Sequence, residues 1–341
     1  MEQRLRIAYL PDEDMGNAYT LRMREILSAF GEVERFDGVK AALVRLVTGR
    51  WRRYDLLVAN WIDNAMLDPA SGRIAPAASL KLFLRTLVMN ACARKAAFVR
   101  HNNYPHATRR GSERLAMRLV DALERLFDVV ITHSGAEAGR RRHYCPHPLY
   151  RLTPREGEPG AGAEEGGLTD MDLPPRYFLV FGRMVPHKRI EDLMAAFPHH
   201  RNLVVAGAVG DAAYVGRLAR MQRPNLFLRA GFLSESRAQQ LVAGADGVVI
   251  SHGEGDVVVS GTFFYALSLG RPVFAVATPF LRWVSPRVGL ALLHLADDLD
   301  GLCALIRRTP SVPVPLLARA AVQWEFGDDA VRAALAAALD L

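Results

Sequence analysis

Short apolar runs alternate with longer stretches of helical periodicity along most of the chain. Runs such as YDLLVANW are almost continuously apolar, which is typical of strands buried inside a parallel sheet. The alternation predicts parallel sheets with helices on both faces. In the first half the expected strands are 5–10, 33–37, 54–61, 96–106 (a strand passing into a loop) and 128–134, and the expected helices are 20–30, 39–48, 80–95, 112–127 and one starting in GAEAGRRRHY, 135–144.

The pattern stops at residues 151–176, which are rich in Gly, Pro and Glu and are expected to form a linker or mobile loop. It then restarts, so we expect an α/β protein of the GT-B kind, with two Rossmann-like doubly wound parallel-sheet domains facing a central cleft. The expected limits are 1–150, 177–327 and a closing helix at 328–341. The second series has strands at 177–181, 202–207, 226–231, 247–251, 271–276 and 289–295, and helices near 190–197, 212–221, 234–243, 260–269, 298–307 and 315–324.

Length and charge narrow the class of protein. A chain of 341 residues is long for one core, which favours two domains. No apolar run approaches the roughly 20 residues of a membrane span, so a cytoplasmic location is expected. The net charge is +7, with +8 in residues 1–150 and −1 in residues 151–341. This imbalance favours an anionic partner for the first half. The three scattered cysteines predict neither disulfides nor a zinc site.

An anion site is expected where the strand 177–181 ends in Gly182-Arg183, with Lys188 five residues further on. Arginine supplies a planar fork and lysine a point charge, a combination suited to a diphosphate. A second candidate follows the strand 247–251, where Ser260, Gly261 and Thr262 open a helix. Free amides and hydroxyls at a helix start can bind phosphate. The alternatives are solvated surface charges and an ordinary serine cap.

The loops after the first-half strands carry a set of mainly polar residues, and the carboxylates and histidines among them could deprotonate a hydroxyl. Because parallel strands end at the same sheet edge, these groups could converge on the cleft. For each of them, loop capping or solvation is the alternative. They are Asp12, Glu13, Asp14 and Gly16 after the first strand, Asn60, Trp61 and Asp63 after the third, and His101, Asn102 and His106 after the fourth.

The second half resembles the donor domain of GT-B glycosyltransferases, particularly family 4 and its bacterial exopolysaccharide relatives. The matching pieces are FGRMVPHKRIEDLMAAF, LVVAGAVGD, LFLRAGFLSESRAQQLVAGADGVVIS and SGTFFYALSLGRPVFA, in the family's order. FVRHNNYPHATRR, DVVITHS and CPHPLY are similar to the acceptor domain of the same relatives. The resemblance implies donor-diphosphate contacts from Arg183, Lys188, Ser260, Gly261 and Thr262, and donor sugar or nucleotide contacts from Gly182, Gly231, Phe232, Leu233, Glu254, Asp256 and Tyr265.

One position departs from family 4. Retaining members carry two glutamates seven residues apart, and alignment on ALSLGRPV places Tyr265 at the second. A similar loss, with a Ser-Gly helix start and an HNxxPH element, occurs in the xanthan-type β-mannosyltransferases of family 94. This resemblance implies inversion, GDP-mannose as donor, a polyprenyl-diphosphate-linked oligosaccharide as acceptor, and no metal or cofactor. The candidate base is one of Asp12, Glu13, Asp14 and His101; the acceptor side comprises Gly16, Asn17, Trp61, Asp63, Asn102 and His106.

The basic first half suits a lipid-linked acceptor, because cationic amphipathic helices bind anionic membrane surfaces. We therefore expect a peripheral protein on the inner face of the plasma membrane. The alternative is that the basic residues form ordinary solvated helix faces. They are Lys81, Arg85, Arg94, Lys95, Arg109, Arg110, Arg114, Arg118, Arg140, Arg141 and Arg142.

Three other hypotheses stay open at this point. A retaining enzyme could use Glu254 or Asp256 in place of the missing acid, and a non-catalytic GT-B scaffold could bind nucleotide alone. A dinucleotide-binding oxidoreductase is disfavoured, because no strand is followed by G-x-G-x-x-G. Nucleic acid is not an expected partner, because the basic stretches lack interleaved aromatic residues.

Overall fold

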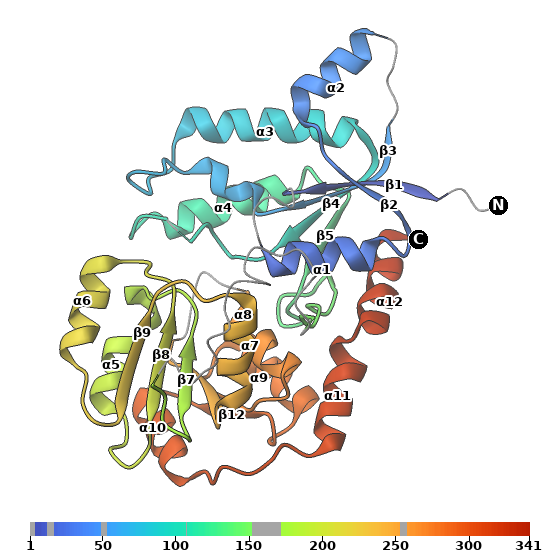
Figure 1. Ribbon diagram of the computed structural model, residues 1–341. Coiled ribbons are helices and arrows are strands. Elements are labelled where there is room, and N and C mark those ends of the chain that lie inside the picture. The colour runs from blue at the N-terminus through green and yellow to red at the C-terminus, as the bar shows by residue number, and fades with distance from the viewer. Residues whose placement is uncertain (1–3, 12–16, 49–52, 107, 152–171, 253–257) are drawn as a thin grey trace. The chain divides into compact units, whose positions relative to one another are not determined.

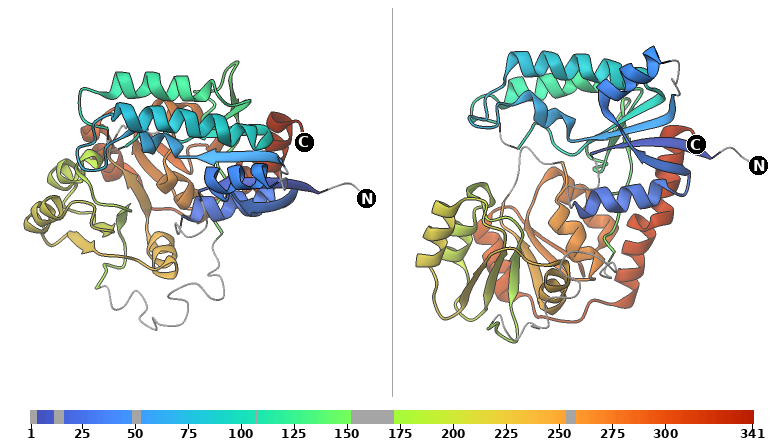
Figure 2. Two further views of the ribbon diagram at one scale, coloured as in Figure 1. Left: turned by 90° about the horizontal axis from the view of Figure 1, so that it is seen from above. Right: turned by 45° about the horizontal axis from the view of Figure 1, so that its top comes forward.

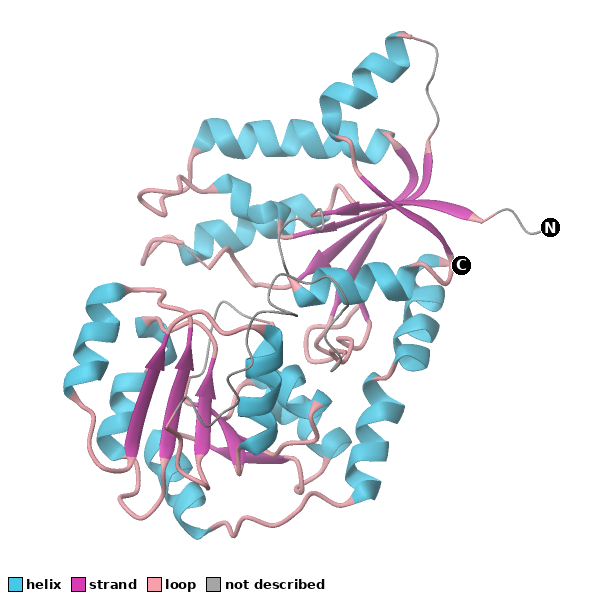
Figure 3. Cartoon of the chain, viewed as in Figure 1, coloured by secondary structure: helices cyan, strands magenta, loops and turns pink. Residues whose placement is uncertain are grey.

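The computed structural model describes residues 4–11, 17–48, 53–106, 108–151, 172–252 and 258–341. The chain divides into two compact units. Unit 1 comprises Met1–Pro148, Gly255–Val259 and Phe326–Leu341, and unit 2 comprises Leu149–Glu254 and Ser260–Glu325. Each unit contains one six-stranded parallel sheet with helices packed against it (Figures 1 and 3). The predicted pair of Rossmann-like domains is confirmed; most of the expected linker, 152–171, lies outside the described residues.

The unit 1 sheet has the strand order β2-β1-β3-β4-β5-β6. Leu57, Phe98 and Val130 pack from its strands against α3 and α4 in one buried apolar cluster, and α3 and α4 lie side by side (Figure 2). The helix α12 packs on β5, β6 and α1. The elements are β1 (Leu5–Leu10), α1 (Ala18–Leu27), β2 (Gly31–Arg35), α2 (Gly38–Val47), β3 (Tyr54–Asn60), the 3₁₀ helix η2 (Ile62–Met66), α3 (Pro76–Ala91), β4 (Ala93–Arg100), α4 (Glu113–Glu124), β5 (Val129–Thr132), β6 (Arg142–Tyr144) and α12 (Asp328–Leu339).

The unit 2 sheet has the order β12-β11-β10-β7-β8-β9. One face buries Phe178, Val205 and Phe274 against α5, α6 and α10, while α8 packs on β10 and β11. The elements are β7 (Phe178–Phe181), the 3₁₀ helix η4 (Pro186–Lys188), α5 (Ile190–Ala196), β8 (Leu203–Gly207), α6 (Ala212–Arg220), β9 (Leu226–Ala230), α7 (Glu235–Gly244), β10 (Gly247–Ile250), α8 (Gly261–Ser268), β11 (Val273–Val276), α9 (Pro279–Val288), β12 (Leu293–Ala296), α10 (Leu299–Arg308) and α11 (Leu316–Phe326).

The strand orders identify the sheet positions at which ligands are expected. In unit 2 the chain runs from β7 outward to β9, and then returns to build β10 to β12 on the other side of β7. In unit 1 the corresponding reversal separates β1 from β3. Ligands of open α/β sheets bind beyond the carboxyl ends of the strands at such a reversal. Gly182 directly follows β7 and Trp61 directly follows β3, so both candidate regions begin at these points.

Several elements differ from the sequence prediction. The helix expected at 80–95 instead spans Pro76–Ala91, and β4 starts at Ala93, inside the expected helix. The tract expected to start a helix at 135–144 instead contains β6, which pairs in parallel with β5 through Val130↔Arg142 and Thr132↔Tyr144. Partly buried ion pairs of Arg142 with Glu124 and Asp121 hold this edge strand, and local periodicity does not reveal these contacts. The helix α9 was not predicted. It starts at Pro279, where the missing N–H is harmless, and the Thr278 side chain caps it.

Candidate active site

Two of the predicted diphosphate residues, Lys188 and Thr262, lie beside Gly182. A Cβ placed on Gly182 would lie 3.2 Å from Lys188 Nζ and 3.8 Å from Thr262 Oγ1. Gly182 has φ of +108°, a conformation that favours glycine. The end of β7 and the nearby 3₁₀ helix η4 therefore meet the start of α8, which is distant in sequence. An ammonium group beside a hydroxyl and a helix start is a suitable arrangement for binding phosphate.

Two backbone contacts fix this arrangement. Gly207, at the end of β8, has φ of +137°, and a Cβ there would lie 2.2 Å from the Gly182 carbonyl oxygen. Only glycine allows these two strand ends to approach so closely. On the other side, the Ser251 hydroxyl donates a 2.6 Å hydrogen bond to the Lys188 carbonyl. The end of β10 thereby holds the segment that carries the lysine.

The start of α8 keeps its polar groups available. Ser260 occupies the cap position, but its side chain makes no capping hydrogen bond. The first amides of a helix have no partner within the helix. A Cβ on Gly261 would lie 3.2 Å from the Tyr150 hydroxyl, so a further phenol stands at this helix start. Burial raises the pKa of Tyr150, which keeps the hydroxyl protonated.

The remaining donor residues are spread along unit 2. Arg183 is exposed and makes no ion pair with any described residue, so its charge is uncompensated in that part of the chain. Phe232, in the loop between β9 and α7, is 88% exposed. Its neighbours Gly231 and Leu233 are half-buried. A surface phenylalanine of this kind can stack on a planar ring.

Tyr265, which replaces the expected glutamate, does not point into solvent. Its hydroxyl donates a 2.6 Å hydrogen bond to Glu235 Oε1 at the start of α7. The Tyr265 ring packs against Phe181 and Tyr150, with centroids 5.3 and 5.5 Å apart. Burial, together with the Glu235 carboxylate, raises the pKa of Tyr265. The hydroxyl therefore stays protonated and acts as a donor.

In unit 1, hydrogen bonds define the tautomer of His101. Asn60 donates through Nδ2 to the Leu10 carbonyl at 2.7 Å, so its Oδ1 is the atom that faces His101. His101 Nε2 lies 2.9 Å from this oxygen and must donate to it. In the neutral ring, Nδ1 then carries the lone pair. No described residue forms a hydrogen bond with Nδ1, so His101 is chemically suited to accept a proton.

An aromatic cluster surrounds this histidine. Trp61 stacks on His101 with centroids 4.1 Å apart, and Tyr19 packs edge-on at 4.7 Å. The Tyr19 hydroxyl donates to His133 Nε2 at 2.7 Å, because His133 Nδ1 donates to the Cys145 carbonyl. His147 completes the cluster. Burial lowers the pKa of His133 to about 4 and lowers the pKa values of His101 and His147 well below 6.5.

A buried arginine holds the loop that carries His101. Arg100 is 2% exposed and donates to Asp121 and Glu124, each at 2.7 Å. Its other nitrogens donate to the carbonyls of Asn102 and Asn103. A guanidinium with partners on two sides fixes a backbone more firmly than a single hydrogen bond does. The network therefore ties the polar loop after β4 to α4.

The other predicted acceptor-side residues have different surroundings. The Asn17 side chain caps α1 by accepting from Tyr19 N, which is a structural role. Asp63 is buried, and this burial raises its pKa to about 6. Asn102 is buried and its Nδ2 lacks a partner among the described residues. His106 is exposed.

Six predicted site residues lie outside the described part of the chain: Asp12, Glu13, Asp14, Gly16, Glu254 and Asp256. Their roles stay predictions. Among the described residues, no group of three or more His, Cys, Asp or Glu could hold a metal ion. Sequence reasoning did not identify Tyr19, Arg100, His133, His147, Tyr150 or Glu235, because their contacts join residues that are distant in sequence.

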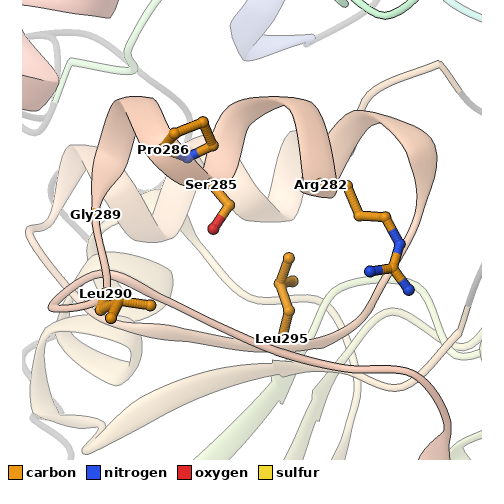
Figure 4. Close-up of a pocket in the computed structure, with 6 residues that line it drawn as sticks. All are labelled: Arg282, Ser285, Pro286, Gly289, Leu290 and Leu295. Atoms are coloured by element: carbon orange, nitrogen blue, oxygen red, sulfur yellow. The ribbon is translucent and has the colours of Figure 1, made fainter.

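A separate pocket in unit 2 contains none of the predicted residues. It has a volume of about 400 Å³ and lies between α9 and the segment leading into β12 (Figure 4). Arg282 at its edge pairs with Asp297. Apart from this paired arginine the lining residues are uncharged, whereas Lys188 and the start of α8 lie beside Gly182, so the Gly182 region is the better candidate for phosphate. The pocket is lined by Arg282, Ser285, Pro286, Gly289, Leu290 and Leu295.

Comparisons with known proteins give the class. No protein-family model matches the chain. The GDP-mannose:glycolipid 4-beta-D-mannosyltransferase of Xanthomonas campestris pv. campestris is 25% identical over 310 residues, covering 84% of this chain and 79% of the relative. Anabaena HepE, crystallised with UDP-glucose, is similar in fold, with a TM-score of 0.62 at 15% identity, covering 99% of this chain and all of that one.

Two further solved structures share this fold. AviGT4, a glycosyltransferase involved in avilamycin A biosynthesis, has a TM-score of 0.55 at 16% identity. The match covers 98% of this chain and 97% of the AviGT4 chain. An α,α-trehalose-phosphate synthase of Burkholderia xenovorans has a TM-score of 0.57 at 12% identity. The match covers 94% of this chain and 82% of the synthase. The fold is therefore GT-B. This fold and the similarity to the mannosyltransferase together identify the chain as a glycosyltransferase of the GT-B type.

Proposed function

We propose that the protein transfers a hexose, mannose from GDP-mannose, to a polyprenyl-diphosphate-linked oligosaccharide, as a step of bacterial exopolysaccharide biosynthesis. The observation that carries this proposal is the relative that is named for GDP-mannose and a glycolipid acceptor and aligns with 84% of the chain. That relative forms a β-mannoside, and GDP-mannose is an α-linked donor. Transfer between these configurations proceeds with inversion.

Unit 2 supplies the proposed donor site. Lys188, Thr262 and the α8 amides bind the diphosphate, and Arg183 adds a second positive charge. Negative charge grows on this diphosphate as the bond to the sugar breaks, so fixed cations and donors stabilise the transition state. The proposed enzyme needs no bound cofactor or metal, because lysine, arginine and amide groups provide this stabilisation.

Unit 1 supplies the proposed base. The acceptor hydroxyl oxygen attacks the anomeric carbon, the bond to the diphosphate oxygen breaks, and the hydroxyl proton passes to His101 Nδ1. The departing GDP retains the electron pair. The Asn60 carbonyl, which accepts from His101 Nε2, stabilises the imidazolium that forms. Asp12, Glu13 and Asp14 stay in the candidate set.

We propose that a surface of unit 1, called the α3–α4 surface, contacts the membrane that carries the lipid-linked acceptor. The helix α3 exposes Leu80, Leu84 and Leu87, with 63, 55 and 52% of each residue accessible, and these leucines lie at helical spacing on one face. Exposed basic residues lie beside them. Apolar side chains flanked by cations match an anionic lipid surface, as on the inner face of the plasma membrane. The α3–α4 surface comprises Leu80, Lys81, Leu84, Arg85, Leu87, Arg114, Leu115 and Arg118.

Other members of the predicted basic set have partners within unit 1. Lys95 donates to the Leu339 carbonyl and to Asp340, and Arg142 pairs with Glu124. Arg94 lies 3.6 Å from Asp55. These three residues are not part of the proposed lipid-binding surface. Among the described residues, each helix is too short or too polar to span a bilayer.

Reversing the charges of Lys81 and Arg85 together is expected to weaken binding to phosphatidylglycerol-containing vesicles at least about tenfold, because each basic residue near an anionic surface contributes about 1 kcal/mol. Vesicle sedimentation measures this change. The matched control reverses Arg307 and Arg308, two exposed residues of α10 in unit 2. Equal losses in both variants, or wild-type binding by Lys81→Glu/Arg85→Glu, would contradict the assignment.

A thermal-shift panel of GDP, UDP, ADP and dTDP tests the donor. A ligand that binds the folded state raises the melting temperature by mass action. We expect GDP to give the largest shift. A larger shift with UDP would move the proposal to another nucleotide sugar, and no shift with any of the four would contradict the donor site.

A further inference from the structure

Glu235 places a carboxylate beside the candidate diphosphate site in a way the sequence does not reveal. It is the first residue of α7, and its Oε1 accepts from Tyr265 at 2.6 Å and from Gln239 at 3.1 Å. Among the described residues, nothing donates to Oε2. Glu235 is half-buried, so one carboxylate oxygen is fixed by protein donors and the other is left to accept from a ligand.

The carboxylate is linked to two parts of the proposed donor site, to one by contacts and to the other along the chain. On one side, Tyr265 packs on Phe181, which directly precedes Gly182, and on Tyr150, whose hydroxyl lies at the start of α8. On the other side, Glu235 follows the exposed Phe232 by three residues. In a nucleoside diphosphate, the ribose lies between the diphosphate and the base. A residue linked to both parts is a candidate for a ribose contact.

The chemistry of the group agrees with this position. An ionised carboxylate only accepts hydrogen bonds, and it repels phosphate oxygens. It therefore needs a ligand part that is uncharged and donates. The two adjacent ribose hydroxyls are such donors, and a carboxylate beyond a strand end is a common partner for them in Rossmann-like folds.

We propose that Glu235 binds the ribose hydroxyls of the nucleoside diphosphate, with Tyr265 and Gln239 positioning its carboxylate. This inference rests on the proposed function and deepens it. Tyr265, at the sequence position of the missing glutamate, contributes a hydroxyl that orients a carboxylate supplied by α7. The site thus retains a carboxylate although the helix α8 has lost one.

Nucleotide affinity measured by titration calorimetry tests the proposal. The ligands are GDP, 2′-deoxy-GDP, 3′-deoxy-GDP and IDP, which lacks the guanine amino group. We expect the wild-type protein to bind GDP about 10- to 100-fold more tightly than at least one deoxy analogue, as a charge-assisted hydrogen bond would give. Glu235→Gln is expected to lose this preference. Tyr265→Phe, which keeps the ring, is expected to reduce the preference without abolishing it.

The control is Glu113→Gln, which removes another glutamate that starts a helix after a serine, in α4 of unit 1. It is expected to retain the wild-type preference.

A purely structural role for Glu235 would lower the melting temperature of Glu235→Gln while leaving its ribose preference intact, and that result would overturn the proposal. If Glu235→Gln lost only the preference for GDP over IDP and kept the preference for GDP over the deoxy analogues, Glu235 would be assigned to the guanine ring instead of the ribose. Tight wild-type binding of GDP and both deoxy analogues would overturn the ribose assignment only, whereas failure to bind any nucleoside diphosphate would overturn the proposed function as well.

Discussion

The replacement His101→Gln is expected to lower kcat for mannose transfer about 10²- to 10⁴-fold, the usual contribution of a general base. Glutamine can still hydrogen-bond to Asn60, but it cannot take the proton of the acceptor hydroxyl. The KM for GDP-mannose is expected to change little, because the residue does not bind the donor in the proposed mechanism. Steady-state transfer rates with saturating donor measure the effect.

The pH profile distinguishes a base from a structural residue. Burial, with the nearby His133, His147 and His106, lowers the pKa of His101 well below 6.5. The ring is therefore neutral at pH 7, and the rate is expected to be flat from pH 8 to 7 and to fall only on the acid side. His143→Gln, which changes an exposed histidine of the same unit, is the control. A His101→Gln rate within threefold of wild type would remove His101 from the candidate set.

The replacement Lys188→Met is expected to lower kcat about 10²- to 10³-fold, the typical cost of losing one preorganised group at a developing negative charge. Methionine is similar in length to lysine and keeps the apolar part of the side chain, so the change mainly removes the ammonium near Gly182 and Thr262. The KM for GDP-mannose is also expected to rise, because the diphosphate is charged in the ground state.

The neighbouring Arg189 gives a matched control. It is an exposed cation one residue further along the chain and pairs with Asp192. Exposed ion pairs contribute little to the stability of a protein, so Arg189→Met is expected to stay folded and to retain activity within a few-fold. Similar losses in both variants would show that general positive charge, rather than the position of Lys188 Nζ, accounts for the effect. Full activity of Lys188→Met would contradict the diphosphate site.

The sequence was sufficient for the fold and for part of the donor site. Apolar runs such as FLVF and LVVAG predict parallel strands because no polar face interrupts them, and such strands are covered on both sides. The convergence of Gly182, Lys188 and Thr262 follows from the same pattern, because parallel strands end at one edge of the sheet.

Contacts between distant segments could not be predicted in this way. The bond from Tyr265 to Glu235 joins residues 30 positions apart, and the bond from Tyr19 to His133 joins residues 114 positions apart. Each side chain alone has an ordinary local context: Glu235 begins a helix and His133 directly follows the strand β5. Edge strand β6 also depends on a distant ion pair, that of Arg142 with Glu124.

The central claim is tested most directly by the anomeric configuration of the product. Purified protein is supplied with GDP-mannose and a polyprenyl-diphosphate oligosaccharide, and the one-bond carbon–proton coupling at the new anomeric centre is measured by NMR. We predict a β-mannoside, formed with inversion. An α-mannoside would contradict inversion, and the absence of transfer from GDP-mannose to an acceptor of this class would contradict the proposed function.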